Sequence, residues 1–431
     1  MSTSRQGPRP RSARSARPAG AGIDPRTFAI ELLGRHEDGR LALIADGLAA
    51  APKALAGRDR ALARELALGA LRHRRLYDCL YERHLRPGSQ PHLLRHALRI
   101  GAHQLYALDR IPVHAAVGET VAALRRAGGE RFVGVANAVL RRLAERRQTQ
   151  RQQPGPLGRI AVADRPGDLA VRHSLPDALL HDLALEPGPE GERRLAAFDV
   201  VAPLCTRLRP GRELPARPVP VRCEGPYAWW SDPAMVLREL VGPGICRVQD
   251  RAQAEAMVRA LAGVPAGARV LDACAAPGGK ALWLHDHGYR VVACDRQAER
   301  CAALRRGLPE DVEVVEQDAR HPVVDDRFDV VVADVPCSNT GVIARRPEAR
   351  WRYDAAHLAS LGELQRAILR ALAPLVAPGG RLIYATCSVV ARENHAVASS
   401  LPGWRIVDEH TAWPDTWQGG GYMASLERVV S

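Results

Sequence analysis

Residues 269–284, with the sequence RVLDACAAPGGKALWL, decide the fold of this chain. The stretch begins as an apolar strand, continues as a turn of small residues that includes Gly278 and Gly279, and ends as a helix. Further apolar runs, separated by helical stretches, occur at residues 291–294, 313–315, 330–333 and 381–385. Strands that alternate with helices predict an α/β domain at residues 251–431, in which a mostly parallel sheet binds its ligand at the carboxyl ends of the strands.

The turn after the first strand indicates the kind of ligand. A phosphate-binding P-loop requires Gly at position 274 and Ser or Thr at position 281, but the chain has Cys274 and Ala281. Asp295 ends the second strand, where an acid can bind a ribose diol, and Asp318 follows the third, where it would face an adenine edge. S-adenosylmethionine, a cofactor without a pyrophosphate, fits this arrangement. A helix cap or a solvated carboxylate remains the alternative for each acid taken alone.

The positive charge of the chain is concentrated at one end. The formal net charge is +13, and residues 1–150 contain 27 Arg and Lys against 13 Asp and Glu, whereas the remainder contains 34 against 35. A basic module joined to a nearly neutral one is typical of proteins that bind a polyanion such as RNA. Arginine enrichment through base composition is the alternative, because Lys53 and Lys280 are the only lysines of the sequence.

An all-helical domain is predicted at residues 24–147, because Asp24 and Pro25 are typical of a helix start and Ala, Leu and Arg then recur at helical spacing. The helices are expected at residues 25–35, 40–50, 58–85, 91–107, 113–127 and 130–146. Residues 1–23, rich in Arg, Ser, Pro and Gly, are predicted to form a disordered basic tail, with an organellar transit peptide as the alternative.

The middle of the chain has no clear periodicity. Residues 148–169 are predicted to form a linker, since they lack the helical spacing that precedes them and contain several Gln, Gly and Pro residues. Residues 170–250 are predicted to form a small α+β intermediate subdomain, with a helix near 176–184 and strands at 204–208 and 219–222.

The nine cysteines indicate a reducing environment, since their number is odd and no pair has the close spacing of a zinc site or a disulfide framework. We therefore expect free thiols, no metal and a cytoplasmic location. No apolar run reaches the ~18 residues of a membrane span, so a soluble protein is expected. Two of the thiols stand out, because Cys337 in DVPCS and Cys387 in ATCS each follow a predicted buried strand.

Several motifs occur together in a fixed order along the chain. They are RIPVHAAVGETV (110–121), GVANAVLRRL (134–143), CAAPGGK (274–280), CD ending at Asp295, QDAR (317–320), DVPCSNTGV (334–342) and YATCSV (384–389). With these motifs the chain resembles the RNA 5-methylcytosine methyltransferases, and most closely the bacterial enzymes for small-subunit ribosomal RNA. The resemblance implies a Rossmann-like methyltransferase domain, a NusB-like helical N-terminal domain and S-adenosylmethionine as the cofactor.

The resemblance also implies a role for each matching residue. Cys387 would attack carbon 6 of cytosine, because carbon 5 is too poor a nucleophile to accept a methyl group unaided. Cys337 would assist release of the product, Asp334 would bond the polar edge of the base, and Lys280 would supply a compact positive charge. The residues assigned to the cofactor are Cys274, Ala275, Ala276, Pro277, Gly278, Gly279, Lys280, Asp295, Asp318 and Asp334.

The segment ARRPEARWRY, residues 344–353, combines cations with aromatic rings, a pattern typical of contact with unpaired RNA. The predicted RNA contacts are Arg345, Arg346, Arg350 and Trp351, with a solvated basic loop as the alternative. The target cytosine is expected to be single-stranded or flipped, since both faces of its ring must be reached. Transfer RNA is the alternative substrate, and a noncatalytic RNA-binding assembly or antitermination factor is the alternative function.

Overall fold

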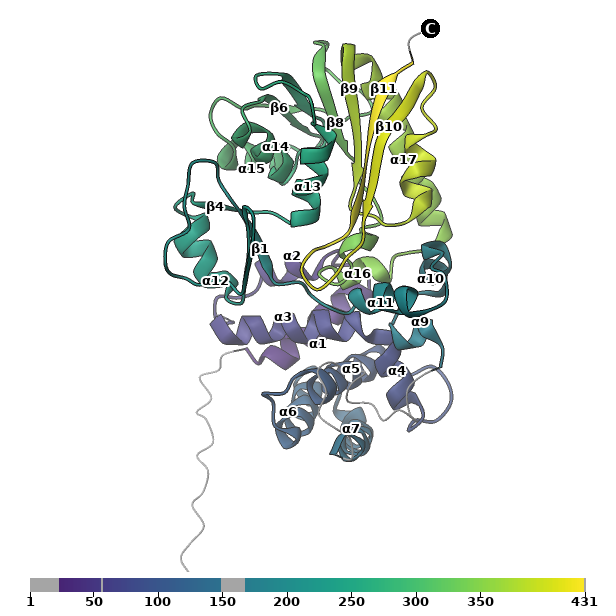
Figure 1. Ribbon diagram of the computed structural model, residues 1–431. Helices are drawn as coiled ribbons and strands as arrows, with labels where there is room; N and C mark the ends of the chain where they lie inside the picture. Colours follow the sequence, from purple (N-terminus) through teal and green to yellow (C-terminus); the bar gives the residue numbers. More distant parts are fainter. Residues whose placement is uncertain (1–22, 56, 149–166, 430–431) are drawn as a thin grey trace, which may run out of the picture.

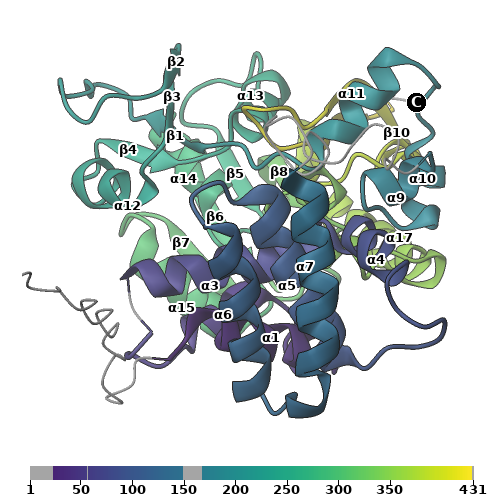
Figure 2. The ribbon, with the colours of Figure 1, turned by 90° about the horizontal axis from the view of Figure 1, so that it is seen from below.

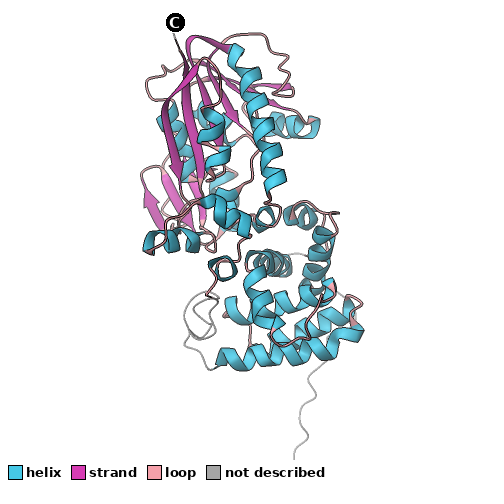
Figure 3. Ribbon diagram, turned by 90° about the vertical axis from the view of Figure 1, so that its right-hand side faces the viewer, coloured by secondary structure: helices cyan, strands magenta, loops and turns pink. Residues whose placement is uncertain are grey.

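The computed structural model describes residues 23–55, 57–148 and 167–429 of the chain (Figure 1). A helical domain lies below an α/β domain, and a small sheet lies beside the latter (Figure 1). Figure 3 shows the two domains as separate lobes, with all the strands in one of them. The predicted tail at 1–23 and linker at 148–169 lie outside the described residues, except for a few residues at their ends.

The helical domain contains helices that pack around a single apolar core. They are α1 (Pro25–Glu37), α2 (Ile44–Ala49), α3 (Gly57–Arg72), α4 (Arg74–Glu82), α5 (His92–Ala107), α6 (Val113–Arg126) and α7 (Val133–Gln148). Asp24 caps α1 by accepting a hydrogen bond from the Thr27 amide at 2.8 Å. The view from below shows α5 enclosed by its neighbours (Figure 2), in agreement with its run of buried residues.

The prediction of one helix at 58–85 is wrong. His73, with φ −112° and ψ 24°, lies outside the helical region of backbone conformations and separates α3 from α4. The apolar spacing continues across this break, so the sequence pattern did not reveal it. The other predicted helices of the domain are confirmed, with shifted ends.

The α/β domain is built on a seven-stranded sheet with the order β10-β11-β9-β8-β5-β6-β7. The strands are β5 (Arg269–Asp272), β6 (Arg290–Asp295), β7 (Glu313–Glu316), β8 (Phe328–Asp334), β9 (Val376–Thr386), β10 (Trp404–Ala412) and β11 (Gly421–Arg428). Strands β5 to β9 are parallel, whereas β10 and β11 are antiparallel and were not predicted. The alternating exposure of β10 marks it as an edge strand, which lacks the continuous apolar run of the central strands.

Two apolar cores cover the faces of this sheet. Along β8, Val330 and Val332 belong to the core beneath α13 (Arg251–Ala260) and α14 (Gly279–Asp286). Val331 belongs to the opposite core, with α17 (Ala355–Leu372) and α18 (His395–Ala398), because successive side chains of a strand point to opposite faces. The predicted α/β fold with a mostly parallel sheet is confirmed.

Residues 170–250 contain a small sheet and three helices, which pack in different places. Strands β1 (Leu204–Leu208), β2 (Arg222–Glu224), β3 (Tyr227–Trp230) and β4 (Cys246–Val248) form a four-stranded sheet of order β2-β3-β1-β4. Helices α10 (Asp177–Leu183) and α11 (Pro189–Ala197) lie against the α/β domain, whereas α9 (Leu169–Arg172) contacts α4 of the helical domain. In that core Leu179 and Phe198 cluster with Tyr353 and Val390.

The strand prediction at 204–208 is confirmed, but the one at 219–222 is displaced. Pro218 and Pro220 have no amide hydrogen to donate to a neighbouring strand, and β2 begins only at Arg222. No helix in the described part of the chain combines the length and the apolar character that crossing a membrane requires.

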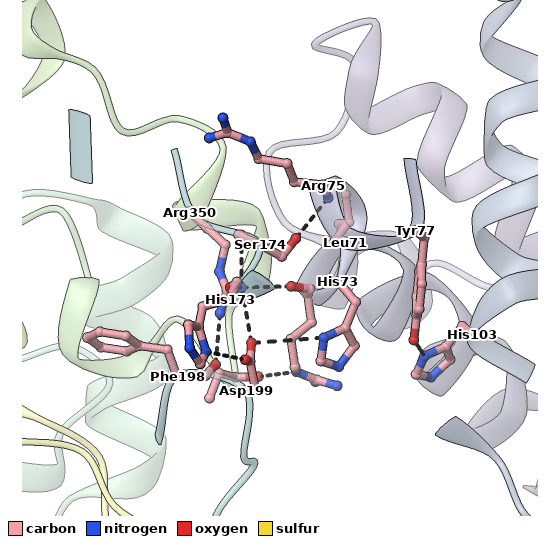
Figure 4. Close-up of polar contacts among 12 residues, drawn as sticks. Leu71, His73, Arg75, Tyr77, His103, His173, Ser174, Phe198, Asp199 and Arg350 are labelled. Atoms are coloured by element: carbon pink, nitrogen blue, oxygen red, sulfur yellow. Dashed lines mark hydrogen bonds and ion pairs between the residues drawn. The ribbon is translucent and has the colours of Figure 1, made fainter. Parts of the chain in front are cut away.

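A buried arginine ties the helical domain to the rest of the molecule. Arg350, in α16 (Pro347–Arg350), is 0% exposed. Its guanidinium donates to the carbonyl oxygens of Arg72 at 2.7 Å, of His173 and Ser174 at 3.1 Å each, and of Phe198 at 2.8 Å (Figure 4). Three segments far apart in sequence therefore meet at one side chain.

The neighbours of Arg350 strengthen the same junction. The Trp351 indole donates to the Leu71 carbonyl at 2.7 Å, and Arg72 donates to the Ala344 carbonyl at 2.9 Å. Arg350 is thus buried between the domains, whereas Trp351 is half-buried with its indole nitrogen engaged there, and their contact with RNA stays a prediction. The residue types were suited to RNA, but the sequence did not show that their polar atoms are needed by backbone carbonyls.

Replacing Arg350 tests the strength of this junction. We expect Arg350→Lys to lower the free energy of unfolding by about 3 kcal/mol, because one ammonium cannot reach carbonyls that lie around a planar guanidinium. Urea denaturation of the full chain measures this change. Arg346→Lys, an exposed position of the same segment, is the control and should change stability by no more than about 0.5 kcal/mol. Equal losses in both variants would contradict a special role for Arg350.

Candidate active site

A cavity of about 380 Å³ lies at the carboxyl ends of the parallel strands, the edge that the sequence predicted for ligand binding. Its size falls in the range of small-molecule sites. The residues predicted for the site that line it are Cys274, Ala276, Pro277, Asp295, Asp318, Asp334, Cys337, Arg346 and Cys387. Most of the predicted site is thus brought together by the fold.

The glycine turn forms one wall of this cavity. Gly278 has φ +105°, a left-handed conformation that favours glycine, and α14 begins at the next residue. The turn is held from below by the Ala275 amide, which donates to the Cys294 carbonyl at 2.7 Å. Ala275 is buried, whereas Cys274, Ala276 and Pro277 line the cavity. Gly279 and Lys280 belong to the first turn of α14, behind the lining.

Two acids stand at the strand ends where a ribose and an adenine were expected. Asp295 is 6% exposed and accepts from the Gln297 amide at 3.1 Å, with Arg300 3.8 Å away. Asp318 forms an ion pair of 2.6 Å with Arg320, whose hydrogen bond lowers the pKa of Asp318 to about 2. Both carboxylates face the cavity. Such acceptors suit ribose hydroxyls and an adenine amino group.

Lys280 and Asp334 form an ion pair at the cavity. The Lys280 ammonium lies 2.6 Å from the Asp334 carboxylate and also donates to Gln253 at 3.0 Å. Burial opposes the charge of Lys280, but the attraction and hydrogen bond of Asp334 outweigh it, so the pKa of Lys280 is raised. The lysine therefore keeps its charge and holds Asp334 in one orientation. Gln253 was not singled out in the sequence, because it lies on α13 outside every motif.

The two thiols meet because their strands are neighbours. In the parallel pair β8 and β9, Asp334 lies opposite Ala385, so Cys337 and Cys387 follow at matching depths. Their sulfur atoms are 3.0 Å apart, and Cys387 also contacts the Asn339 side chain at 3.2 Å. The contact with Cys387, and then burial, raise the pKa of Cys337 well above its usual value. Cys337 therefore retains its proton, while the less buried Cys387 faces the cavity.

Comparison with known proteins identifies the family. Residues 260–406 match the 16S rRNA methyltransferase RsmB/F family, and residues 24–145 match the NusB family. The ribosomal RNA small subunit methyltransferase B of Xanthomonas campestris is 34% identical over 404 residues, covering 88% of this chain and 88% of that protein. Its Vibrio cholerae counterpart is 32% identical over 399 residues, covering 86% of this chain and 88% of that protein.

The chain belongs to the RsmB/F family of 16S rRNA methyltransferases. It is an S-adenosylmethionine-dependent methyltransferase with a NusB-like helical domain, as the motifs predicted. A crystal structure of the protein PH0851 has the same overall fold, with a TM-score of 0.70 at 19% identity. That match covers 95% of this chain and 100% of the other.

The other two predicted RNA contacts of this RsmB/F protein, Arg345 and Arg346, lie in different surroundings. Arg346 is exposed, lines the cavity beside the thiols and has no acidic partner among the described residues. Arg345 instead forms an ion pair of 2.8 Å with Asp250. Arg346 is thus free to meet a phosphate, whereas Arg345 is engaged within the protein.

Asp272 is a further carboxyl at the site that the sequence analysis did not assign to it. Asp272, the last residue of β5, is 0% exposed, and neither of its carboxyl oxygens has a hydrogen-bond partner among the described residues. Burial, and then the charge of Asp334, raise its pKa to about 7. The signal was available, because Asp272 is an acid at the end of a strand directly before the glycine turn.

Within the described residues, one group has side chains close enough to hold a metal ion. Glu37, His92 and His96 lie together in the helical domain, away from the cavity. Arg95 donates to Glu37 at 2.8 Å and to His92 at 3.2 Å. The Arg95 guanidinium already balances the negative charge of Glu37. We therefore assign the group of Glu37, His92 and His96 a structural role in the helical domain.

The raised pKa of Asp272 predicts a pH-dependent cost to stability. An acid whose pKa rises on folding, here from about 4 to about 7, destabilises the folded state increasingly as the pH climbs through this range. Asn at 272 has no charge to bury, so Asp272→Asn should be more stable than the unchanged protein. We expect its advantage to grow by about 2–3 kcal/mol between pH 5 and pH 8.

Urea denaturation of both proteins without cofactor, at several pH values, measures this difference. A constant difference in unfolding free energy between pH 5 and pH 8 would show that Asp272 does not titrate in that range. If the stability advantage of Asp272→Asn instead shrinks as the pH rises, folding lowers the pKa of Asp272 and does not raise it.

Proposed function

We propose that this chain methylates carbon 5 of cytosine in small-subunit ribosomal RNA through a covalent cysteine adduct. The observation that carries the proposal is the pair of thiols, 3.0 Å apart at the edge of the cavity. Methyl transfer to oxygen or to an amino group needs no sulfur nucleophile, whereas carbon 5 of cytosine must first be activated by addition at carbon 6. The names of the relatives from Xanthomonas and Vibrio support ribosomal RNA.

In the proposed reaction the two cysteines have different tasks. Cys387, as the thiolate, forms a bond to carbon 6, and the electron pair displaced from the ring double bond makes carbon 5 nucleophilic. After methylation the carbon 5 proton passes to water, the electron pair of the broken C–H bond restores the ring double bond, and the Cys387 thiolate is expelled. Cys337, which keeps its proton beside Cys387, assists this release.

Asp334 and Lys280 are proposed to hold the polar edge of the base. Because Lys280 keeps Asp334 in an ion pair, the carboxylate is better suited to accept a hydrogen bond from the cytosine amino group than to donate a proton. This hydrogen bond fixes the ring so that carbon 6 lies toward Cys387. We therefore propose that Asp334 hydrogen-bonds the base without protonating it.

S-adenosylmethionine supplies the methyl group in this proposal. The residues proposed to hold it are the turn from Cys274 to Lys280, together with Asp295, Asp318 and Asp334. The fit is supported by the carboxylates at two successive strand ends and by the cavity of about 380 Å³ between them and the thiols. We propose a cytoplasmic enzyme, because ribosomal RNA is its proposed substrate.

The substrate can be tested directly. The protein is incubated with S-adenosylmethionine and with isolated small-subunit ribosomal RNA or transfer RNA, and bisulfite sequencing maps 5-methylcytosine. Methylation of a defined ribosomal cytosine is expected. Methylation of transfer RNA alone would replace the substrate, and a methyl group on any atom other than carbon 5 would refute the proposed chemistry.

The roles of the cysteines can be separated by substitution. Cys387→Ala should lower methylation by about a thousandfold or more, a loss of about 4 kcal/mol of transition-state stabilisation, because no adduct forms. Cys337→Ala should form the adduct but release it slowly, so that a protein–RNA band accumulates in denaturing gels. Mass spectrometry locates the link.

Cys223→Ala is the matched control, because this thiol is exposed on β2, far from the cavity residues in the sequence and outside their lining. It should leave the methylation rate unchanged. An adduct on a side chain other than Cys387, or full activity of Cys387→Ala, would disprove the assignment of the nucleophile.

Arg346 is proposed to contact an RNA phosphate near the target base. Arg346→Ala should weaken RNA binding about tenfold and reduce the dependence of affinity on salt by about one counterion. Filter binding at several salt concentrations measures both quantities. Arg370→Ala, at an exposed arginine of α17, is the control. An equal loss of RNA affinity in this variant would show that only the net charge of the protein matters, and would contradict a specific contact of Arg346.

A further inference from the structure

Beneath the two thiols lies a carboxylate that no motif singled out. Glu393, in a short helix at Ala391–Glu393, is 0% exposed. Among the described residues it forms no ion pair. A buried carboxylate without a cation is costly, so its oxygens must be satisfied by hydrogen bonds.

The donors to Glu393 come from both cysteine loops. One carboxylate oxygen accepts from the Ser338 amide at 2.8 Å and from Gln365 at 3.1 Å. The other oxygen accepts from the Ser388 hydroxyl at 2.9 Å and from the Ser338 hydroxyl. These contacts fill the four lone-pair positions of an ionised carboxylate.

Each of the two serines directly follows one of the thiols in sequence. Ser338 follows Cys337 at the end of β8, and Ser388 follows Cys387 at the end of β9. Glu393 therefore bonds both loops one residue beyond the reacting sulfur atoms. The loops are also joined directly, since Thr340 and Ser388 lie 2.8 Å apart through their hydroxyl oxygens.

The backbone of Glu393 is fixed as well. Tyr384, near the end of β9 and three residues before Cys387, donates its hydroxyl to the Glu393 carbonyl at 2.5 Å. Gln365 of α17 donates to the Pro336 carbonyl at 2.9 Å, just before Cys337. The main chain of Glu393 is thus anchored to β9, and its carboxylate is anchored to α17 through Gln365.

We infer that Glu393 is the positioning residue that sets the distance between the two thiols. The expected effect of Glu393 on methylation rests on the proposed function, whereas its effect on the distance between the thiols does not. With Glu393 in place, the loops at 337–340 and 387–390 act as one rigid unit. Without it, four donors lose this acceptor, and the direct contacts between the loops, such as that of Thr340 with Ser388, are left to hold them together.

Oxidation of the thiols measures their distance without any RNA. Diamide removes two protons and two electrons from a pair of thiols, leaving a disulfide and the reduced hydrazine. Because the sulfur atoms of Cys337 and Cys387 lie 3.0 Å apart, we expect this pair to be oxidised rapidly. Mass spectrometry of the linked peptides follows the rate in the full chain.

Variants of Glu393 should change that rate in a graded way. Glu393→Ala should slow formation of the Cys337–Cys387 disulfide at least tenfold, whereas Glu393→Gln, which keeps the shape and one acceptor oxygen, should fall between Glu393→Ala and the unchanged protein. The rate constant for methylation at saturating substrates should fall in the same order. The Michaelis constant for S-adenosylmethionine should stay within about twofold, because Glu393 does not line the cavity.

Glu409→Gln is the matched control. Glu409, on β10, also accepts hydrogen bonds from side chains, from Tyr422 at 2.5 Å and from His395 at 3.1 Å. It touches neither cysteine loop. This variant should keep the disulfide rate and the methylation rate of the unchanged protein, even where its thermal stability falls.

The outcomes are decisive in each case. An unchanged disulfide rate in both Glu393 variants overturns the inference, as does an equal loss in Glu409→Gln. If Glu393→Ala does not fold, Glu393→Gln alone decides, and a rate equal to that of the unchanged protein overturns the inference. A graded disulfide rate in a protein that never methylates carbon 5 would refute the proposed function and leave the positioning role standing.

Discussion

The parallel pairing of β8 with β9 is the constraint on which the site depends. Because Asp334 lies opposite Ala385, the residues after these two strands reach the same edge of the sheet at the same depth. One strand delivers a carboxylate and a thiol, and its neighbour delivers the second thiol. A slip of one residue would turn every side chain of β9 to the other face and separate the sulfur atoms.

Most of the charged side chains around this edge of the sheet form ion pairs. Lys280 is bonded to Asp334, Arg320 to Asp318 and Arg345 to Asp250. Asp272 and Glu393 are different, since both are buried without a cation. The first has unsatisfied oxygens and a raised pKa, and the second is surrounded by donors. Two buried acids of this edge therefore differ in whether hydrogen bonds satisfy their carboxyl oxygens.

The sequence predicted what is local and missed what is distant. The glycine turn, the strand-end acids and the paired thiols could be placed because strand order alone brings them to one edge. Arg350 and Trp351 could not, since their partners lie at Arg72, His173 and Phe198, and no spacing reveals that junction. For the same reason Glu393 went unnoticed, because its significance comes from loops that follow other strands.

The junction at Arg350 limits how the molecule can move. With one guanidinium shared by three segments, rotating the helical domain away from the α/β domain would break several buried hydrogen bonds at once. The two lobes in Figure 3 are therefore coupled through this side chain, and a ligand held by one lobe meets the other in a fixed orientation.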